Sequence, residues 1–109
     1  MYVRTRAEGS QSILEVEGEI DAHTAPQLKS AIGILLDEEK SALVVDLERV
    51  TFMDSTGLGV LVSALKRVRE MNGELRIVCT RRAILRVLEI TGLDKVLSLY
   101  SSLSEATSS

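Results

Sequence analysis

A buried strand that leads into an amphipathic helix is the feature that most constrains the fold of this chain. Residues 42–47 form a short, nearly continuous apolar run, which is typical of a strand buried on both faces of a sheet. Beyond residues 50–57, apolar residues recur at helical spacing and charged residues occupy the opposite helix face. We therefore predict a strand, a loop at 50–57 and a helix over 56–71. The apolar stripe of this helix consists of Leu58, Leu61, Val62, Leu65 and Val68.

The most informative residues lie where this loop enters the helix. Asp54, Ser55 and Thr56 favour a helix start, because their side-chain oxygens accept hydrogen bonds from the unpaired amides of the first turn. Gly57 and Gly59 follow, although each Gly costs about 1 kcal/mol relative to Ala inside a helix. We infer that another group approaches this backbone closely.

The residues around the helix start also indicate how a partner protein could bind. Phe52 and Met53 are of types that usually pack inward, so we expect at most one of them to be exposed. An exposed Met53 or Leu58 would make an apolar anchor for a partner. A helix start also tolerates a phosphate, because free amides and the helix dipole favour negative charge there. Phosphorylation of Ser55 is therefore compatible with a folded domain.

The remaining segments alternate between strands and helices. An initial hairpin is predicted from residues 2–8 and 11–18, and Thr24 or Asp21 caps a following helix with Pro26 in its first turn. Asn72 and Gly73 end the helix over 56–71, because both residues tolerate the left-handed conformation. The next elements are a strand at 74–79 and a helix at 81–90, which Thr80 caps and Gly92 ends. A strand at 96–99 follows. A short final helix starts at the capping box 102–105, and we expect a disordered tail at 107–109.

This alternation predicts an α/β fold with a mostly parallel sheet and right-handed crossover connections. Loops that follow the carboxyl ends of parallel strands are the usual position of functional residues in such sheets. Two loops qualify here, at 18–24 and 50–57, because each leads into a helix and carries an acid next to hydroxyls. We expect the functional site at these two loops.

Length and composition exclude several classes of protein. The 109 residues suit one domain, which we place at 1–109 with an ordered core at about 2–106. A net charge of -3 and an aromatic content of 3% do not favour nucleic-acid binding. Cys79 is the only cysteine, so no disulfide framework is expected. The sequence has no apolar run of about 18 residues and no signal-peptide pattern, so we expect a cytoplasmic protein.

Three chemical alternatives stay open at the two loops. Ser55 is a hydrolase nucleophile only if His23, the single histidine, lies within hydrogen-bond reach as its base. Asp21, His23 and Asp54 are a conceivable metal site, although their spacing matches no recognised ligand pattern. The glycine pair in 57–59 lacks the third Gly of a dinucleotide fingerprint and the Gly-Lys-Ser/Thr of a P-loop, so it is a weak phosphate-binding signal.

Basic residues on the two later helices form a further candidate feature. We expect them to lie on solvated helix faces. The alternative is a single basic surface that meets an acidic partner. The residues concerned are Lys66, Arg67, Arg69, Arg81, Arg82 and Arg86.

Several segments together resemble one protein family. Most of the resemblance is carried by Phe52-Met53-Asp54-Ser55-Thr56-Gly57-Leu58-Gly59-Val60-Leu61, and residues 18–25, 44–47, 76–79 and 90–93 extend it over nearly the whole chain. On these residues the chain resembles the anti-anti-sigma factors, or anti-sigma factor antagonists, which are small bacterial proteins of the STAS fold. The resemblance implies a mixed, mostly parallel sheet of about five strands with an N-terminal hairpin, and about four helices packed mainly on one face.

The resemblance also implies a switch controlled by phosphorylation. In that family the unphosphorylated protein binds an anti-sigma factor with GHKL-type serine kinase activity and frees a sigma factor. The kinase then phosphorylates the serine that corresponds to Ser55, which switches binding off, and a PP2C-type phosphatase reverses the modification. Thr56 is a secondary acceptor candidate, because some family members have Ser at this position.

Both loops are expected to contribute to the partner-binding surface. The resemblance implies that the acid of the first loop, Asp21, binds the partner. We expect no catalytic residue, cofactor or metal, no nucleic-acid or membrane partner, and a monomer or weak dimer. The alternative function is a STAS scaffold subunit of a signalling complex that is phosphorylated but has no sigma factor downstream. The expected partner-binding residues are Asp21, His23, Thr24, Met53, Asp54, Thr56, Gly57, Leu58 and Gly59.

Overall fold

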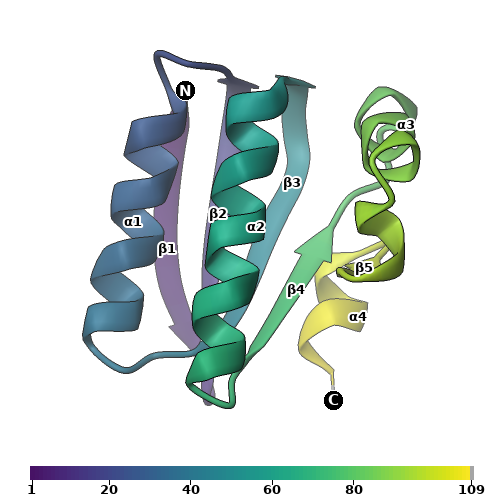
Figure 1. Ribbon diagram of the computed structural model, residues 1–109. Coiled ribbons are helices and arrows are strands. Elements are labelled where there is room, and N and C mark those ends of the chain that lie inside the picture. The colour runs from purple at the N-terminus through teal and green to yellow at the C-terminus, as the bar shows by residue number, and fades with distance from the viewer. Residues whose placement is uncertain (109) are drawn as a thin grey trace.

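The computed structural model describes residues 1–108. Within these residues an initial hairpin is followed by alternating helices and strands, and a short 3₁₀ helix, η1, follows α3 (Figure 1). In chain order the elements are β1 (Tyr2–Glu8), β2 (Gln11–Ile20), α1 (Ala25–Asp37), β3 (Ala42–Met53), α2 (Ser55–Glu70), β4 (Glu74–Val78), α3 (Arg82–Ile90), η1 (Leu93–Lys95), β5 (Ser98–Tyr100) and α4 (Leu103–Thr107).

The strands form one sheet in the order β1-β2-β3-β4-β5. β1 and β2 are antiparallel, and their hairpin pairs Tyr2 with Glu17 and Glu8 with Gln11. The other neighbouring strands are parallel. Parallel neighbours need a crossover connection, which α1, α2 and α3 supply in turn. The predicted mostly parallel sheet with an N-terminal hairpin is confirmed.

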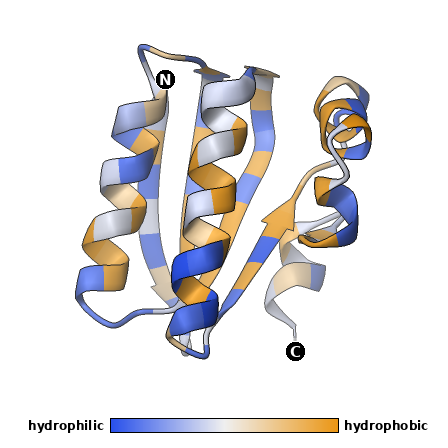
Figure 2. Cartoon of the chain, viewed as in Figure 1, coloured by the Kyte–Doolittle hydropathy of each residue, from blue (hydrophilic) through white to orange (hydrophobic). Residues whose placement is uncertain are grey.

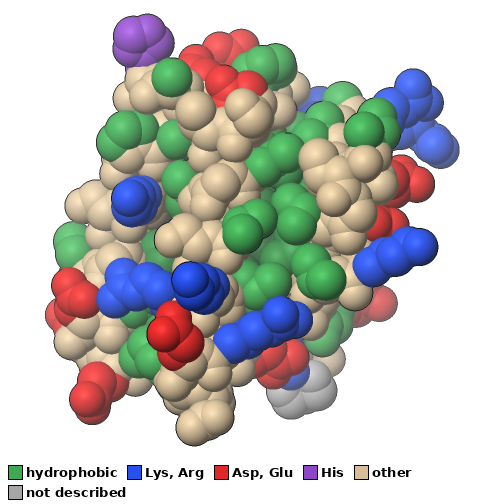
Figure 3. Space-filling model, in the orientation of Figure 1, with side chains coloured by type: hydrophobic (Ala, Val, Ile, Leu, Met, Phe, Trp, Pro, Cys, Tyr) green, Lys and Arg blue, Asp and Glu red, His purple; other side chains and the backbone are tan. Residues whose placement is uncertain are grey.

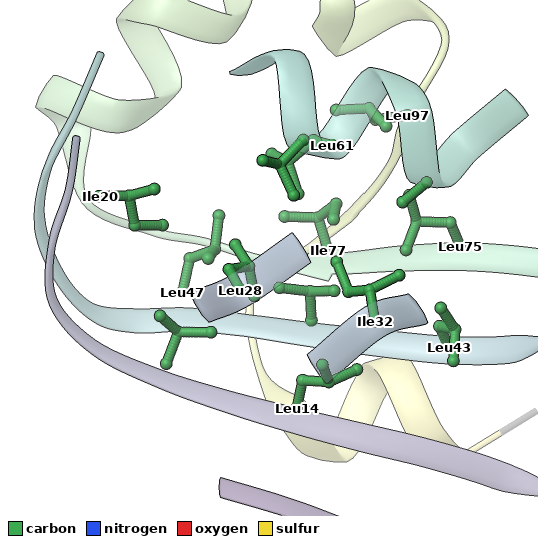
Figure 4. Close-up of a cluster of buried hydrophobic side chains, with 14 of the residues drawn as sticks. Leu14, Ile20, Leu28, Ile32, Leu43, Leu47, Leu61, Leu75, Ile77 and Leu97 are labelled. Carbon is green, nitrogen blue, oxygen red and sulfur yellow. The ribbon is translucent and has the colours of Figure 1, made fainter. Parts of the chain in front are cut away.

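Helices α1, α2 and α3 pack on one face of the sheet, and α4 covers part of the other face. The main core cluster joins alternate strand residues to helix residues such as Leu28 and Leu61, which are fully buried (Figure 4). Leu88 of α3 is fully buried in the same cluster. On the opposite face Val44 packs in a smaller cluster with Ala106 of α4. Burial of these apolar side chains is the main favourable term in folding. The prediction that the helices lie mainly on one face is confirmed.

β3 is longer than predicted and extends to Met53, so only Asp54 separates it from α2. Val50 and Met53 are buried, and Met53 pairs with Ile20 at the end of β2. The predicted loop at 50–57 is therefore wrong in its extent. Exposed residues interrupt the apolar pattern in the second half of β3, but they do not end its backbone pairing with β2.

The start of α3 and the last strand differ from the prediction. Thr80 does not cap α3, because its hydroxyl donates to Glu48 Oε2 at 2.7 Å and Arg81 occupies the N-cap position. Gly92 adopts a left-handed conformation after α3, as a helix stop requires. The chain then forms η1, so β5 starts at Ser98 rather than at residue 96.

The end of α2 depends on both predicted stop residues, but for different reasons. Asn72 has a φ of 57°, so it takes the left-handed conformation. Gly73 is required by space instead, because a Cβ atom there would lie 2.3 Å from the carbonyl oxygen of Ser41. The predicted stop is confirmed, and only one of its two residues is left-handed.

The predicted C-terminal capping box is confirmed in its N-cap residue, Ser102, whereas the Glu105 carboxylate accepts from the hydroxyls of Ser101 and Ser102 rather than from the Ser102 amide. Ser102 Oγ accepts a hydrogen bond from the Glu105 amide at 3.1 Å, and α4 follows. Thr107 is the last residue of α4, so the prediction of disorder is wrong for this residue. Ser109, the last residue of the predicted tail, lies outside the described residues.

Candidate functional site

A backbone hydrogen bond joins the two predicted functional loops. The amide of Asp54 donates to the carbonyl oxygen of Ile20 at 3.1 Å, directly beyond the pairing of Ile20 with Met53. Asp21 follows Ile20 in the chain, so the acids of both loops lie at the same edge of the sheet. Figure 1 shows this edge next to the N-termini of α1 and α2, and Figure 3 shows acidic side chains gathered on it.

Asp54 caps helix α2. Its backbone is extended, and its carboxylate accepts hydrogen bonds from the amides of Thr56 at 2.9 Å and Gly57 at 3.3 Å. The hydroxyl of Thr56 donates to the same carboxylate oxygen. The hydrogen bond from this hydroxyl, together with those from the two amides, holds the pKa of Asp54 below its usual value. Asp54 is therefore a carboxylate at neutral pH, one residue before Ser55.

The two neighbouring hydroxyls differ in their hydrogen bonding. Ser55 is the first residue of α2, and its side chain is exposed. Within residues 1–108 the Ser55 hydroxyl forms no hydrogen bond to another group, whereas that of Thr56 donates to Asp54. The hydroxyl of Ser55 is therefore free, and that of Thr56 is engaged in the helix cap. The residue types alone left this difference open.

The first loop is organised by the side chain of Asp21. Asp21 Oδ1 accepts hydrogen bonds from the amides of His23 at 2.9 Å and Thr24 at 3.1 Å. Burial would raise the pKa of Asp21, but these hydrogen bonds and that of the Thr24 hydroxyl hold it below its usual value. His23 is exposed, and its hydrogen bond to Asp21 is made by its amide rather than by its imidazole.

Thr24 is the N-cap residue of α1, as one of the two predictions stated, and Pro26 lies in the first turn. The side chain of Thr24 forms no hydrogen bond with the amides of the first turn of α1. The Thr24 hydroxyl instead donates to the Glu19 carbonyl at 2.7 Å and accepts from the Asp21 amide at 2.9 Å. Thr24 thus fixes the loop that leaves β2, rather than the helix that follows it.

The two glycines of α2 have different surroundings. A Cβ atom at Gly57 would lie 2.6 Å from Met53 Cγ and 2.8 Å from Ile20 Cγ2. The close approach predicted from the glycines is therefore made at Gly57 by the core of the chain itself. Gly59 is exposed, and a Cβ atom there would meet nothing within 4 Å. Gly59 leaves its stretch of α2 open to another molecule.

A groove between α1 and α2 begins beside the phosphate-accepting candidates. Its volume is about 450 Å³. Small residues form most of its surface, and one lysine contributes the positive charge. We call it the α1/α2 groove. Its lining includes Ala22, Ala25, Lys29, Thr56, Gly59 and Ser63.

The predicted apolar anchors need correction. Met53 and Leu58 are 4% and 8% exposed, so neither side chain is available to a partner, and Gly57 is buried with them. Phe52 is 48% exposed and is the large apolar side chain that β3 presents near this edge. Alternation along a strand explains the result, because neighbours point to opposite faces. The expectation that at most one of Phe52 and Met53 is exposed is confirmed.

The chemical alternatives gain no support from the geometry. No hydrogen bond links His23 to Ser55 in the part of the chain that the structure describes. Among the same residues no three His, Cys, Asp or Glu side chains come together as a metal site would require, so Asp21, His23 and Asp54 do not form one. None of the described helices is long and apolar enough to span a membrane.

Comparisons with known proteins agree with this geometry. A family model described as "STAS domain" matches residues 2–106. An anti-sigma-B factor antagonist of Listeria monocytogenes is 43% identical over 84 residues, which cover 77% of this chain and 74% of the relative.

Two solved structures share the fold. An anti-sigma factor antagonist from Mycobacterium paratuberculosis has a TM-score of 0.91 at 34% identity, with 98% of this chain and 91% of that chain covered. The Bacillus cell fate determinant SpoIIAA in its phosphorylated form has a TM-score of 0.78, with 98% and 97% covered. Its identity is 18%, so this second likeness concerns the fold alone.

Proposed function

This chain belongs to the STAS domain family, and we propose that it is an anti-sigma factor antagonist whose binding is controlled by phosphorylation of Ser55. In the proposed cycle the unphosphorylated protein binds an anti-sigma factor and thereby frees a sigma factor. The anti-sigma factor is a GHKL-type serine kinase that phosphorylates Ser55, and a PP2C-type phosphatase removes the phosphate. The relative from Listeria monocytogenes, which is an anti-sigma-B factor antagonist, supports the class of partner.

The free hydroxyl of Ser55 is the observation on which this proposal depends. It is exposed at the start of α2, directly after the ionised Asp54 and at the edge that also carries Asp21. The α1/α2 groove, which Thr56 and Gly59 help to line, offers an adjoining surface for the partner. A partner seated on this edge would contact Ser55 itself.

Electrostatics explains why a phosphate there would release the partner. Phosphoserine adds about -1.5 to -2 charge at neutral pH. At Ser55 that charge is placed beside the carboxylate of Asp54. A partner that accommodates a neutral hydroxyl must then bury a phosphate next to a carboxylate, and like-charge contacts at an interface cost several kcal/mol. A loss of ~2.8 kcal/mol already weakens binding about a hundredfold.

The same position explains why the fold would survive the modification. Ser55 lies at the N-terminus of α2, where the positive end of the helix dipole favours a negative group. Ser55 contributes no side-chain hydrogen bond to the described residues, so none is lost. We therefore propose a switch that acts on the binding surface and leaves the domain folded. The protein needs no catalytic residue of its own in this scheme.

A binding experiment tests the proposal directly. Ser55→Asp and Ser55→Ala variants are titrated with the candidate kinase-fold anti-sigma factor in the presence of ADP. We expect Ser55→Ala to bind like the wild type and Ser55→Asp to bind about a hundredfold more weakly. Ser30→Asp adds the same charge at an exposed position of α1 and serves as the matched control. Equal affinity of Ser55→Asp and Ser55→Ala would contradict the proposal.

A second readout separates the proposal from the scaffold alternative. Incubation with the kinase and ATP should place phosphate on Ser55, and addition of the unphosphorylated protein to a complex of sigma factor and anti-sigma factor should release the sigma factor. Phosphorylation of Ser55 without release of any sigma factor would favour a scaffold subunit of a signalling complex. Location in the cytoplasm and a monomeric or weakly dimeric state stay predictions.

A further inference from the structure

A second groove lies on α2, on the side that faces η1 and the start of β5. Its volume is about 490 Å³. We call it the α2/η1 groove. Figure 3 shows hydrophobic side chains gathered in the hollow between α2 and the segment that follows α3. Its apolar surface consists of Val62, Leu65, Leu93 and Val96.

This apolar surface is open to a partner. Val62 and Val96 are 44% and 45% exposed, and Leu65 and Leu93 are half-buried beside them. They come from two separate segments of the chain, which together form a concave surface. Contiguous exposed apolar surface of this kind marks sites of interaction with proteins.

The charges beside the apolar surface are mostly positive. Lys66 and Arg69 line the groove, with Glu70 as the acidic residue next to them. Figure 2 shows the hydrophilic residues of α2 in its C-terminal half. Arg67 forms an ion pair with Asp37 at 3.2 Å, whereas Lys66 and Arg69 form none within residues 1–108. Arg69 Nη2 donates a hydrogen bond to the carbonyl oxygen of Val96 at 3.5 Å. Lys66 and Arg69 are therefore the basic residues of α2 that have no carboxylate partner among the described residues.

The α2/η1 groove is separate from the site at Ser55. Lys66 lies eleven residues after Ser55 on the same helix, which is about 16 Å at 1.5 Å per residue. This separation exceeds the Debye length of about 8 to 10 Å at physiological salt. A charge added at Ser55 has little electrostatic effect on the groove.

We propose that the α2/η1 groove is a docking surface for an acidic amphipathic helix of a partner protein. The apolar side chains of such a helix fill the groove, and its acidic residues meet Lys66 and Arg69. A second copy of this chain fits less well, because a two-fold contact places the same basic residues of both copies in one interface. The docking is independent of the phosphorylation state of Ser55, and it does not depend on the proposed antagonist function.

A peptide experiment tests the docking. The probe is a fluorescein-labelled, Ala-rich helical peptide of about 15 residues, with Leu at helical spacing on one face and Glu beside it. A matched probe carries Lys in place of Glu. We expect the Glu probe to bind, to shift the amide resonances of Val62, Leu65 and Val96, and to bind the Ser55→Asp variant equally well. The Lys probe should bind at least about tenfold more weakly.

Charge reversal on the protein provides the complementary test. The double variant Lys66→Glu/Arg69→Glu should weaken the Glu probe about tenfold. Arg82→Glu/Arg86→Glu makes the same change of net charge at exposed positions of α3 and should leave binding unchanged. All four residues are exposed, so both variants should fold.

Three outcomes would overturn the docking proposal. One is equal binding of the Glu and Lys probes, and another is a set of shifted resonances outside the groove. The third is concentration-dependent self-association that perturbs Val62 and Val96, which would assign the groove to a second copy of the chain.

Discussion

The hydroxyl of Thr56 donates a hydrogen bond to the carboxylate of Asp54, so the helix cap and the residue beside the proposed phosphorylation site form one unit. The same carboxylate oxygen accepts hydrogen bonds from the backbone amides of Thr56 and Gly57. This arrangement engages Thr56 and leaves the hydroxyl of Ser55 free. The geometry of a helix cap therefore distinguishes the hydroxyls of the two adjacent candidate acceptors.

Replacement of Thr56 should change the acidity of Asp54. Thr56→Val removes the hydroxyl that contributes most to lowering the pKa of Asp54, so this pKa should rise toward the model-peptide value of 3.8. Thr56→Ser restores the hydroxyl and should restore the lowered pKa. A carbon-detected NMR titration of the Asp54 carboxyl group measures both. An unchanged pKa in Thr56→Val would show that the hydroxyl does not carry this effect.

The pKa of Asp46 is shifted upward, in contrast to that of Asp54, so ionisation of Asp46 should lower stability. Burial, followed by the charges of Glu48 and Glu15, raises the pKa of Asp46 in the folded state. Its contribution to stability is therefore present at low pH and is lost as the pH rises through the folded pKa. Asp46→Asn should raise the urea midpoint at pH 7, because it removes the partly buried charge. The hydrogen bond that the Glu48 amide donates to Asp46 Oδ1 at 3.0 Å can be kept by the side-chain oxygen of Asn.

The gain from Asp46→Asn should disappear when unfolding is measured below about pH 3, where Asp46 is protonated in both the folded and the unfolded state. Glu89→Gln removes one negative charge at an exposed position of α3 and controls for net charge. A gain that persists at low pH would contradict ionisation as its cause.

Alanine at the two glycines of α2 should have opposite effects on the free energy of unfolding. Gly57→Ala forces a Cβ atom against Met53 and Ile20 and should destabilise the fold by about 1–3 kcal/mol. Gly59→Ala has free space and should stabilise α2 by about 0.5–1 kcal/mol. Urea denaturation measures both variants. A destabilised Gly59→Ala protein would mean that this position is more crowded than the structure indicates.

Gly59→Ala should also weaken binding of the anti-sigma factor if the partner uses the α1/α2 groove, because the added methyl group projects from an exposed part of its lining. Stability and affinity would then change in opposite directions in one variant. Ala25 lies in the same groove but is buried, so it offers no comparable test.

The fold should be insensitive to charge at Ser55. Phosphorylated and unphosphorylated protein should give nearly superimposable circular dichroism and amide exchange, because Ser55 is exposed and its side chain forms no hydrogen bond to the described residues. Ser12 is buried, and Ser12→Asp should by contrast lower stability. Broad loss of amide protection on phosphorylation of Ser55 would instead indicate a switch that works by unfolding.

The predictable part of the site follows from local chemistry. Asp54 was predicted as a residue of the helix start because its side chain can satisfy first-turn amides, and the cap is present. Thr80 has equally suitable chemistry but bonds to Glu48, thirty-two residues away. The local sequence does not show whether the Thr80 hydroxyl accepts from a helix amide or donates to a carboxylate, because Glu48 comes close to Thr80 only in the folded sheet.

The limits of prediction are clearest in β3. Its apolar run identified the strand but placed its end too early, because exposed residues such as Phe52 interrupt the pattern. Pairing with β2 keeps the backbone extended as far as Met53. That pairing also buries Met53 against Gly57, which removes the expected apolar anchor.

The sequence by itself determined the order of strands and helices, the mostly parallel sheet and the helix start that presents Ser55, because these depend on periodicity and on the chemistry of neighbouring residues. Only the tertiary structure decided which hydroxyl is free, which apolar side chain is exposed and where the two grooves lie. These properties depend on contacts between segments that are distant in the chain. The bond from Asp54 to Ile20 is one such contact, and no local pattern contains it.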